Sequence, residues 1–235
     1  DKLTLVLDKY MLFKSPHKHK AESSEPVINF VNGSTVATSQ KLPKIDLTLR
    51  NLYFQNHNLG AIKMSLHQEA NDLYLESGSL TSPDMNLIFS GANYCFGCGS
   101  DTSYVDLQFS GKINNAGNVI YSLDQGRVMD KGNGVVDGAL QWNGGFQDFN
   151  VLQTVGSVNA SLSSGKFLEV NPGVLGGLLS IINLQGVFEV GSMDVQDLFK
   201  KGFFFNQLDV NADILTSQVE LKHVYMSGPM AKVNS

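Results

Sequence analysis

Cys95 and Cys98 are the chain's two cysteines, and their CxxC spacing is the motif that could most directly do redox or metal chemistry. A structural zinc site needs two further ligands at a recognisable spacing, and none accompanies this pair. A thioredoxin-like site needs its CxxC at the start of a helix in a βαβ pattern. Here the motif lies in a glycine-rich stretch between strand-like segments, so we predict neither chemistry.

Two histidines, His17 and His19, lie close together in a polar tract from Lys14 to Pro26. They could bind a metal weakly, but no Cys or carboxylate group stands near them at a ligand spacing. We therefore interpret the tract as a solvated surface loop and predict no metal and no cofactor. The sequence also contains no Gly-x-Ser-x-Gly, P-loop or His-Glu-x-x-His motif, so we do not predict an enzyme.

The composition, with 42% hydrophobic and 17% charged residues, is typical of a folded protein. A net charge of −5 without a concentrated basic stripe argues against nucleic acid as a partner. No apolar run reaches the roughly 18 residues that cross a bilayer, and the first residues do not resemble a signal peptide. We expect a soluble segment excised from a longer protein.

Alternation with a period of two residues dominates the chain and predicts strands that bury one face. Ile45, Leu47 and Leu49 alternate with polar residues, and the pattern returns around Met64 and Leu87. Turn-forming residues at 56–58, 69–72 and 82–84 separate these segments, so the spacing predicts a β-meander. Later strands are expected around Val136 to Trp142, Val158 to Leu162 and Leu208 to Ile214.

The segment from Phe167 to Val210 has an unusual order of elements. Asn171-Pro172-Gly173 leads into Val174 to Leu184, where leucines recur at helical spacing and predict an amphipathic helix. A second helix is predicted to start at Asp194 and to stop at Gly202. We expect the first helix to cover one end of the sheet through Leu175, Leu178, Leu179 and Ile182; a membrane-surface role and plain core are the alternatives.

These blocks resemble the C-terminal region of AsmA-like proteins, particularly the YhdP-type members. The similar elements are Phe-Leu-Glu-Val at 167–170, the Gly-rich Leu-Leu helix, the Asp-Val…Phe-Lys-Lys-Gly-Phe block at 194–203 and Gly228-Pro229-Met230-Ala231. Leu42 to Leu49 and Ala139 to Trp142 are also similar. The chain departs from the family at Leu184 to Val187, where members typically carry a Pro-Arg-Arg-like tripeptide.

The resemblance implies a mainly β fold: a strongly curved antiparallel sheet that forms a groove, with one or two short amphipathic helices near its C-terminal part. It implies residues 1–41 as an N-terminal strand and polar loop, 42–166 as a repeating β-meander groove, and 167–235 as a C-terminal block. It also implies a periplasmic segment of a protein anchored in the inner membrane, with an anchor before Asp1 and further chain after Ser235.

The implied function is to shield phospholipid acyl chains and to support phospholipid transport between the inner and outer membranes. The implied partners are phospholipid, the two membrane surfaces and envelope proteins. In an oxidising periplasm, a Cys95–Cys98 disulfide is the favoured state of the CxxC motif, with free thiols as the alternative. The groove candidates are Ile45, Leu47, Leu49, Ile62, Met64, Leu66, Met85, Leu87, Phe89, Val105, Leu107, Phe109, Leu140, Trp142, Ala160 and Leu162.

The alternation alone does not distinguish an open groove from a β-sandwich, because both bury one face of each strand. The alternative function is therefore a non-enzymatic sandwich module that docks an envelope protein or a glycan through its polar face. Exposed aromatic residues would mark a glycan site, and Tyr104, Tyr121 and Trp142 are the candidates for it. One open sheet would favour the lipid groove, whereas two sheets sealed together would favour the module.

Overall fold

The structure, a computed structural model, describes residues 2–12, 42–96, 102–123, 126–150, 153–168, 182–183, 203–216, 218–228 and 232–234. Strands dominate these residues, as the sequence predicted. The strands are β1 (Lys2–Leu7), β2 (Tyr10–Leu12), β3 (Lys44–Phe54), β4 (His57–Glu69), β5 (Asp72–Thr81), β6 (Met85–Tyr94), β7 (Tyr104–Ile113), β8 (Met129–Asn143), β9 (Val155–Phe167), β10 (Ile182–Asn183), β11 (Phe203–Leu215), β12 (Gln218–Ser227) and β13 (Lys232–Asn234). A helix α1 (Ala116–Ser122) and a 3₁₀ turn η1 (Phe146–Asp148) complete the described elements.

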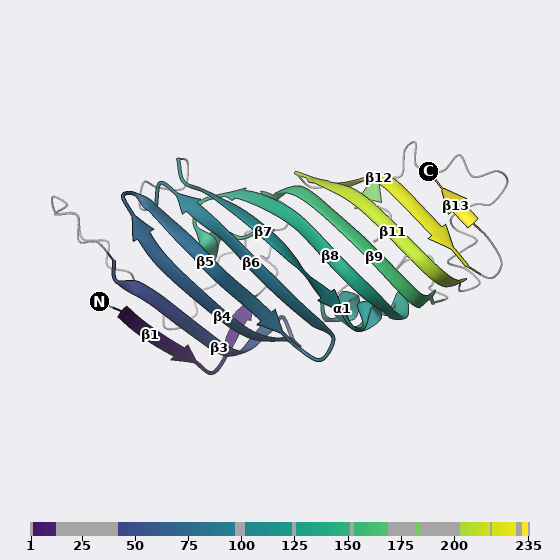
Figure 1. Ribbon diagram of the computed structural model, residues 1–235, viewed down its shortest axis with the longest axis horizontal. Coiled ribbons are helices and arrows are strands. Elements are labelled where there is room, and N and C mark those ends of the chain that lie inside the picture. The colour runs from purple at the N-terminus through teal and green to yellow at the C-terminus, as the bar shows by residue number, and fades with distance from the viewer. Residues whose placement is uncertain are drawn as a thin grey trace, which may run out of the picture.

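All these strands belong to one open, curled sheet (Figure 1). Its order is β1-β3-β4-β5-β6-β7-β8-β9-β11-β12-β10, with β2 paired to β3 and β13 paired to β12. Neighbours from β3 to β12 are antiparallel, as predicted. The prediction of a purely antiparallel sheet is wrong at the edges, where β1 and β2 pair in parallel with β3, and β10 with β12. Parallel pairing requires a long connection, and long stretches of chain separate β2 from β3 and β10 from β12.

The register places apolar residues opposite one another in rows that run across the sheet. Because directly paired residues lie on the same face, such a row can be followed from strand to strand. One row from β3 to β12 consists of Leu49, Ile62, Leu80, Leu87, Gly111, Val136, Ala160, Val210 and Val224. We call this side of the sheet the apolar face.

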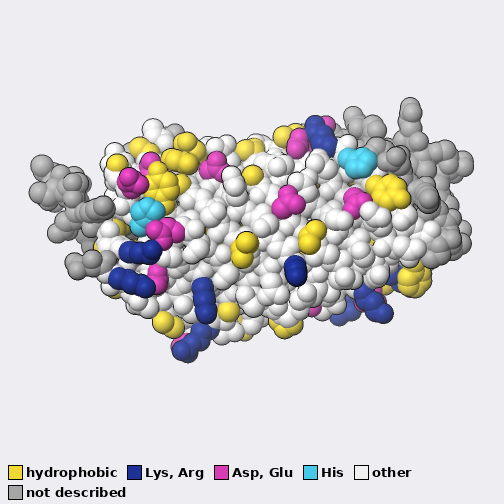
Figure 2. Space-filling view, in the orientation of Figure 1, with side chains coloured by type: hydrophobic (Ala, Val, Ile, Leu, Met, Phe, Trp, Pro, Cys, Tyr) yellow, Lys and Arg dark blue, Asp and Glu magenta, His cyan; other side chains and the backbone are white. Residues whose placement is uncertain are grey.

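The opposite side of the sheet is the polar face. Its equivalent row is Thr48, Lys63, Ser79, Ile88, Ser110, Asp137, Asn159, Asn211 and His223. In Figure 2 most of the visible surface is white, the colour of uncharged polar side chains and backbone, with single hydrophobic side chains over the middle and a group of them at the upper left. The sheet therefore has one face suited to water and one that must be covered or occupied.

Helix α1 packs along one margin of the apolar face. We call this margin the α1 rim. Asn115 caps the helix by accepting a hydrogen bond from the Asn118 backbone N–H (3.1 Å). Gly117 permits close approach to β8, because a Cβ at this position would lie 2.4 Å from the carbonyl oxygen of Met129. Val119 and Ile120 pack against the hydrophobic core. The sequence analysis did not predict this helix.

The opposite margin, which we call the Trp142 rim, is closed by packed side chains and a buried polar network. The Trp142 indole N–H donates to the carbonyl oxygen of Gly145 (2.9 Å), and its ring meets Phe149 edge-on. Asn93, which is 1% exposed, donates to the Ser103 hydroxyl (2.8 Å) and to the Gly144 carbonyl (3.0 Å). Burial of a polar side chain is tolerated here because its hydrogen bonds are made.

Several predicted elements lie outside the described residues: the polar tract of Lys14 to Pro26, the helix from Asp194, and most of the helix from Val174, including Leu175, Leu178 and Leu179. Ile182 is a correction, because it lies in β10 and pairs in parallel with Val219 rather than belonging to a helix. Two adjacent β-branched residues, Ile181 and Ile182, favour an extended conformation. The helical spacing of the leucines concealed this preference.

Candidate functional site: an apolar trough

The groove candidates predicted from the alternation lie together on the apolar face. Ile45, Leu47 and Leu49 of β3 pair with Leu66, Met64 and Ile62 of β4. In the centre of the sheet, Phe89 pairs with Phe109, Leu107 with Leu140, and Val105 with Trp142. Ala160 pairs with Val136 on one side and Val210 on the other. Of the remaining members, Leu87 of β6 lies in the row of Ala160, and Met85 of β6 and Leu162 of β9 share a separate row of the same face.

Burial divides these residues into packed margins and a partly open middle. Met85 and Leu162 near the α1 rim are 5% and 8% exposed, and Val105 near the Trp142 rim is fully buried. Leu49 and Trp142 are also buried. The residues between the rims are half-buried: Ile45, Leu47, Ile62, Met64, Leu66, Leu87, Phe89, Leu107, Phe109, Leu140 and Ala160. We call this half-buried strip, with Val136, Val158 and Val210, the trough.

Two phenylalanine rings line the middle of the trough. Gly78 faces Phe89 and Gly138 faces Phe109 across neighbouring strands. A Cβ at Gly78 would lie 2.0 Å from the Phe89 ring, and a Cβ at Gly138 would lie 2.7 Å from the Phe109 ring. The glycines therefore let the rings lie against the sheet instead of standing away from it. A larger side chain at either glycine would collide with the ring that faces it.

The chemistry of the trough is that of a non-directional apolar surface. β3 and β12 are eight strand steps apart in the sheet order, which corresponds to about 38 Å at about 4.8 Å per step. Burial of a methylene group contributes about 0.8 kcal/mol. Methionine at position 64 adds a flexible side chain that adapts to variable shapes. The trough is thus suited to long, flexible hydrocarbon groups rather than to a compact polar ligand.

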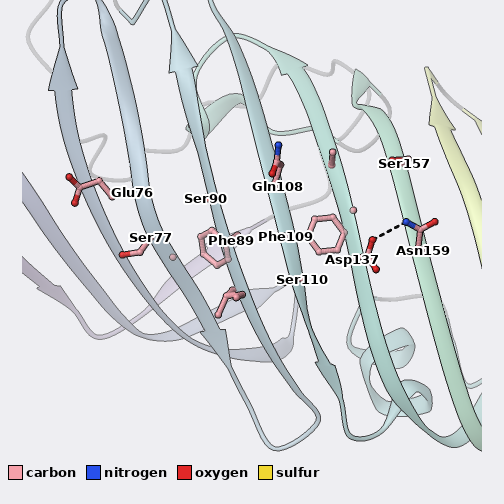
Figure 3. Close-up of a pocket in the computed structure, with 14 residues that line it drawn as sticks. Glu76, Ser77, Phe89, Ser90, Gln108, Phe109, Ser110, Asp137, Ser157 and Asn159 are labelled. Atoms are coloured by element: carbon pink, nitrogen blue, oxygen red, sulfur yellow. Dashed lines mark hydrogen bonds between the residues drawn. The ribbon is translucent and has the colours of Figure 1, made fainter.

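A second hollow, of about 690 Å³, lies over the polar face (Figure 3). Small hydroxyl side chains line it, among them Ser77, Ser90 and Ser110, together with Gln108. Phe89 and Phe109, whose rings belong to the apolar face, also border this hollow. The Asn159 amide donates to the Asp137 carboxylate there (2.8 Å). Among the described residues, no group of three or more His, Cys, Asp or Glu side chains is arranged to hold a metal ion.

Ion pairs reinforce the polar face near the β1 edge. Lys44 donates to Glu76, and this hydrogen bond lowers the pKa of the Glu76 carboxyl and raises the pKa of the Lys44 ammonium. Lys2 lies 2.6 Å from Asp46 and, as a hydrogen-bond donor, lowers the pKa of that carboxyl. These groups are solvent-exposed, so the pairs make a small contribution to stability.

Cys95 is disulfide-bonded, and its backbone N–H donates to Asp72 (2.9 Å). Cys98 lies outside the described residues, so the Cys95–Cys98 pairing stays a prediction.

Of the candidate glycan-binding aromatics, Trp142 is 6% exposed, whereas Tyr104 and Tyr121 are 37% and 40% exposed. Tyr104 stacks on Tyr94 (4.8 Å between ring centroids), far along the strands from Tyr121 in α1.

The residues that the sequence analysis missed are those of the α1 rim. The Tyr121 ring meets His57 of β4 edge-on, with 4.7 Å between centroids, and Arg127 lies over the same ring at 5.3 Å. An Asn115 cap followed by Val119 and Ile120 is the local signal that could have revealed the helix. None of the described helices is long and apolar enough to cross a bilayer.

Comparison with known proteins gives one family match. The profile of a family described as "YhdP protein" matches residues 1–235, which is the whole chain. Searches of curated proteins and of solved structures found no match.

Proposed function

This chain belongs to the YhdP protein family over residues 1–235, and on that premise we propose that its trough shields the acyl chains of phospholipids in transit between membranes. The family is AsmA-like and associated with lipid transport. The trough supplies a place on this chain where that activity can be located. Phospholipid is accordingly the proposed ligand, and shielding it from water is the proposed task.

The observation that carries the proposal is the apolar row through Ala160. The row crosses nine strands, from Leu49 to Val224, and each of its residues has an apolar side chain except Gly111. All the described strands lie in one sheet, so no second described sheet covers this row. An apolar face of this length has to be shielded from water. Acyl chains provide such cover, and they gain about 0.8 kcal/mol for each methylene they bury.

Location and partners follow from the family premise. The segment is proposed to lie in the periplasm as part of a protein anchored in the inner membrane. It would receive phospholipid from one membrane surface and pass it toward the other, with envelope proteins as further partners. Shielding requires no bond to be made or broken, so the proposed role is non-enzymatic.

Mass spectrometry of organic extracts from the purified chain tests the proposal. Phospholipid at a stoichiometric level relative to protein is the expected result. A variant with Leu87→Asp is an unsuitable control, because a charge in the row would damage a packed core and a lipid site alike. Extracts free of phospholipid, from a chain that unfolds cooperatively and does not bind added fluorescent phospholipid, would contradict the proposal.

A second proposal uses the hollow of the polar face. The sequence analysis placed this alternative role on a two-sheet sandwich, and that architecture is wrong, since the described strands form a single sheet. The hollow nevertheless presents hydroxyl and amide groups of the kind that bind glycans or polar protein surfaces. Ser90→Trp would fill it, and loss of glycan or partner binding with unchanged lipid content would support this second role.

A further inference from the structure

The two rims of the trough differ in charge. Four exposed or half-buried cations lie along the α1 rim: Arg127, Lys131 and Lys166, and also Lys112, whose position next to Gly111 places it on the polar face. Figure 2 shows Lys and Arg side chains gathered where Figure 1 places α1. Two described carboxylates lie at the same margin: Asp84, which accepts a hydrogen bond from Asn118 (2.8 Å), and Asp130, which is paired with Lys166 across β8 and β9.

The Trp142 rim has the opposite character. Glu69, Asp72, Asp106 and Asp148 lie at the strand ends and in the turn on this side. The cations on this side of the trough are paired: Lys44 with Glu76, and Lys222 with both Asp213 (3.5 Å) and Glu220 (3.1 Å). By contrast, no described carboxylate forms an ion pair with the four α1-rim cations. Arg127 and Lys131 therefore offer an anion positive charge that has no described ion-pair partner, whereas the carboxylates of the Trp142 rim repel an anion. Lys166 is less available, because it lies opposite Asp130 and over the Phe204 ring, 4.9 Å from the centroid.

Arg127 is held in a geometry that suits a phosphate ligand. Its guanidinium lies over the face of the Tyr121 ring, 5.3 Å from the centroid. An arginine stacked in this way keeps its N–H edge available for a bidentate contact with phosphate oxygens. His57 of β4 contacts the same ring edge-on, with 4.7 Å between the ring centroids, and helps to hold it in place.

Lys131 lies next to α1 in an unusual backbone conformation. Its φ of 60° is in the left-handed region, which a non-glycine residue rarely adopts. A Cβ at the following residue, Gly132, would lie 3.3 Å from the Cβ of Ala116 at the start of α1. This strained position in β8 thus lies close to the helix, and such outliers are a reason to look for a function.

We propose that the α1 rim binds the phosphate of a phospholipid whose acyl chains lie in the trough, with Arg127 and Lys131 as the main cationic contacts. This inference rests on the proposed function. It gives the lipid one orientation, with the headgroup at the α1 rim and away from the Trp142 rim. The ligand class is any phosphate-bearing diacyl lipid, because the rim recognises the phosphate and the trough recognises the chains.

The test compares two fluorescent probes with identical acyl chains, a phospholipid and a diacylglycerol that lacks phosphate. The full chain is expected to bind the phospholipid about tenfold more tightly at low ionic strength. In the Arg127→Gln, Lys131→Gln double variant this preference is expected to disappear, while diacylglycerol binding stays unchanged. A matched Lys44→Gln, Lys222→Gln variant, which removes two cations outside the α1 rim, is expected to retain the preference. High ionic strength should reduce the preference of the unaltered chain for phospholipid over diacylglycerol.

The outcomes separate this inference from the function on which it rests. If the unaltered chain binds neither probe, the lipid-shielding function itself fails. If it binds both equally, or if the double variant keeps the preference, the trough stands and the phosphate site is wrong. Loss of both probes in the double variant would show that the rim supports packing rather than phosphate binding. Displacement of the phospholipid by inorganic phosphate at matched ionic strength would assign the rim to free phosphate and overturn the lipid orientation.

Discussion

Tyr121 of α1 contacts His57 of β4 edge-on, with 4.7 Å between the ring centroids. The strands β5, β6 and β7 lie between β4 and β8 in the sheet order. Since α1 also packs against β8 through Gly117, the helix bridges the ends of these three strands. The contact ties two distant parts of the curled sheet together and defines one margin of the trough.

Tyr121→Ala should loosen this margin. The variant loses the contact with His57 and the support under Arg127, and each aromatic or cation–π contact contributes about 0.5–1.5 kcal/mol. We expect a loss of about 1 kcal/mol in the free energy of unfolding, and faster hydrogen exchange of the Val119 and Leu123 amides, which donate within α1. Tyr121→Phe keeps both ring contacts and should behave as the unaltered chain. Equal exchange rates in the two variants would show that the ring does not hold α1 in place.

Two methionines on the apolar face should differ in their contribution to stability. Met85 is 5% exposed in the hydrophobic core near the α1 rim, whereas Met64 is half-buried in the trough. Met85→Ala leaves a cavity and should cost about 2–4 kcal/mol. Met64→Ala should cost about 1 kcal/mol or less, because its side chain is already partly in solvent. Urea unfolding curves measure the free energy of unfolding of each variant. Equal losses of this free energy in the two variants would mean that the middle of the trough is packed as tightly as its margin.

The alternation predicted the face of each strand because its period matches that of the backbone. Leu47, Met64 and Phe109 were assigned to one surface from the sequence, and the register places them in one row, which runs from Leu47 and Met64 through Gly78 and Phe89 to Phe109. Whether that surface is open or sealed was not predictable from the pattern, since a sandwich shows the same alternation. The resemblance to AsmA-like proteins, and not the periodicity, favoured the open sheet.

Other features depend on contacts that local sequence does not encode. Beyond its Asn115 cap and two apolar residues, helix α1 gives little local signal, because its seven residues, Gly117 among them, are too few for a periodic pattern and too weak to form a helix alone. Its formation depends on packing against β8 and β4. The parallel pairing of β1 with β3 is set by a partner far along the chain. Burial of Val105 and Trp142, which were predicted to face the groove, arises from the way the Trp142 rim closes over them.

The Lys44–Glu76 pair predicts that the stability of the fold decreases slightly at both acidic and alkaline pH. The pKa of Glu76 is lowered from its ordinary value of 4.5 by the hydrogen bond from Lys44, so its stabilising effect is present above that value and is lost as the pH falls through the lowered pKa. The pKa of Lys44 is raised from 10.5, so that contribution is present below 10.5 and is lost as the pH rises through the raised pKa.

Melting temperatures across the acidic range check the prediction for Glu76. Because the pair is exposed, the expected effect is small. The Glu76→Gln variant should melt slightly below the unaltered chain at neutral pH and should approach it as the pH falls below 4.5 and through the lowered pKa of Glu76. A difference that stays constant through the acidic range would show that the variant acts through packing and not through the charge of Glu76.

The most direct test of the trough places a large side chain at Ala160, between Val136 and Val210. Ser163→Trp is the matched control, because Ser163 is exposed and opposite Asn133 and Gln207 outside the apolar row. We predict that Ala160→Trp abolishes fluorescent phospholipid binding with nearly unchanged thermal stability, and that Ser163→Trp leaves both unchanged. A large loss of stability in Ala160→Trp would indicate a closed core, and full phospholipid binding by a stable Ala160→Trp chain would contradict the trough as the lipid site.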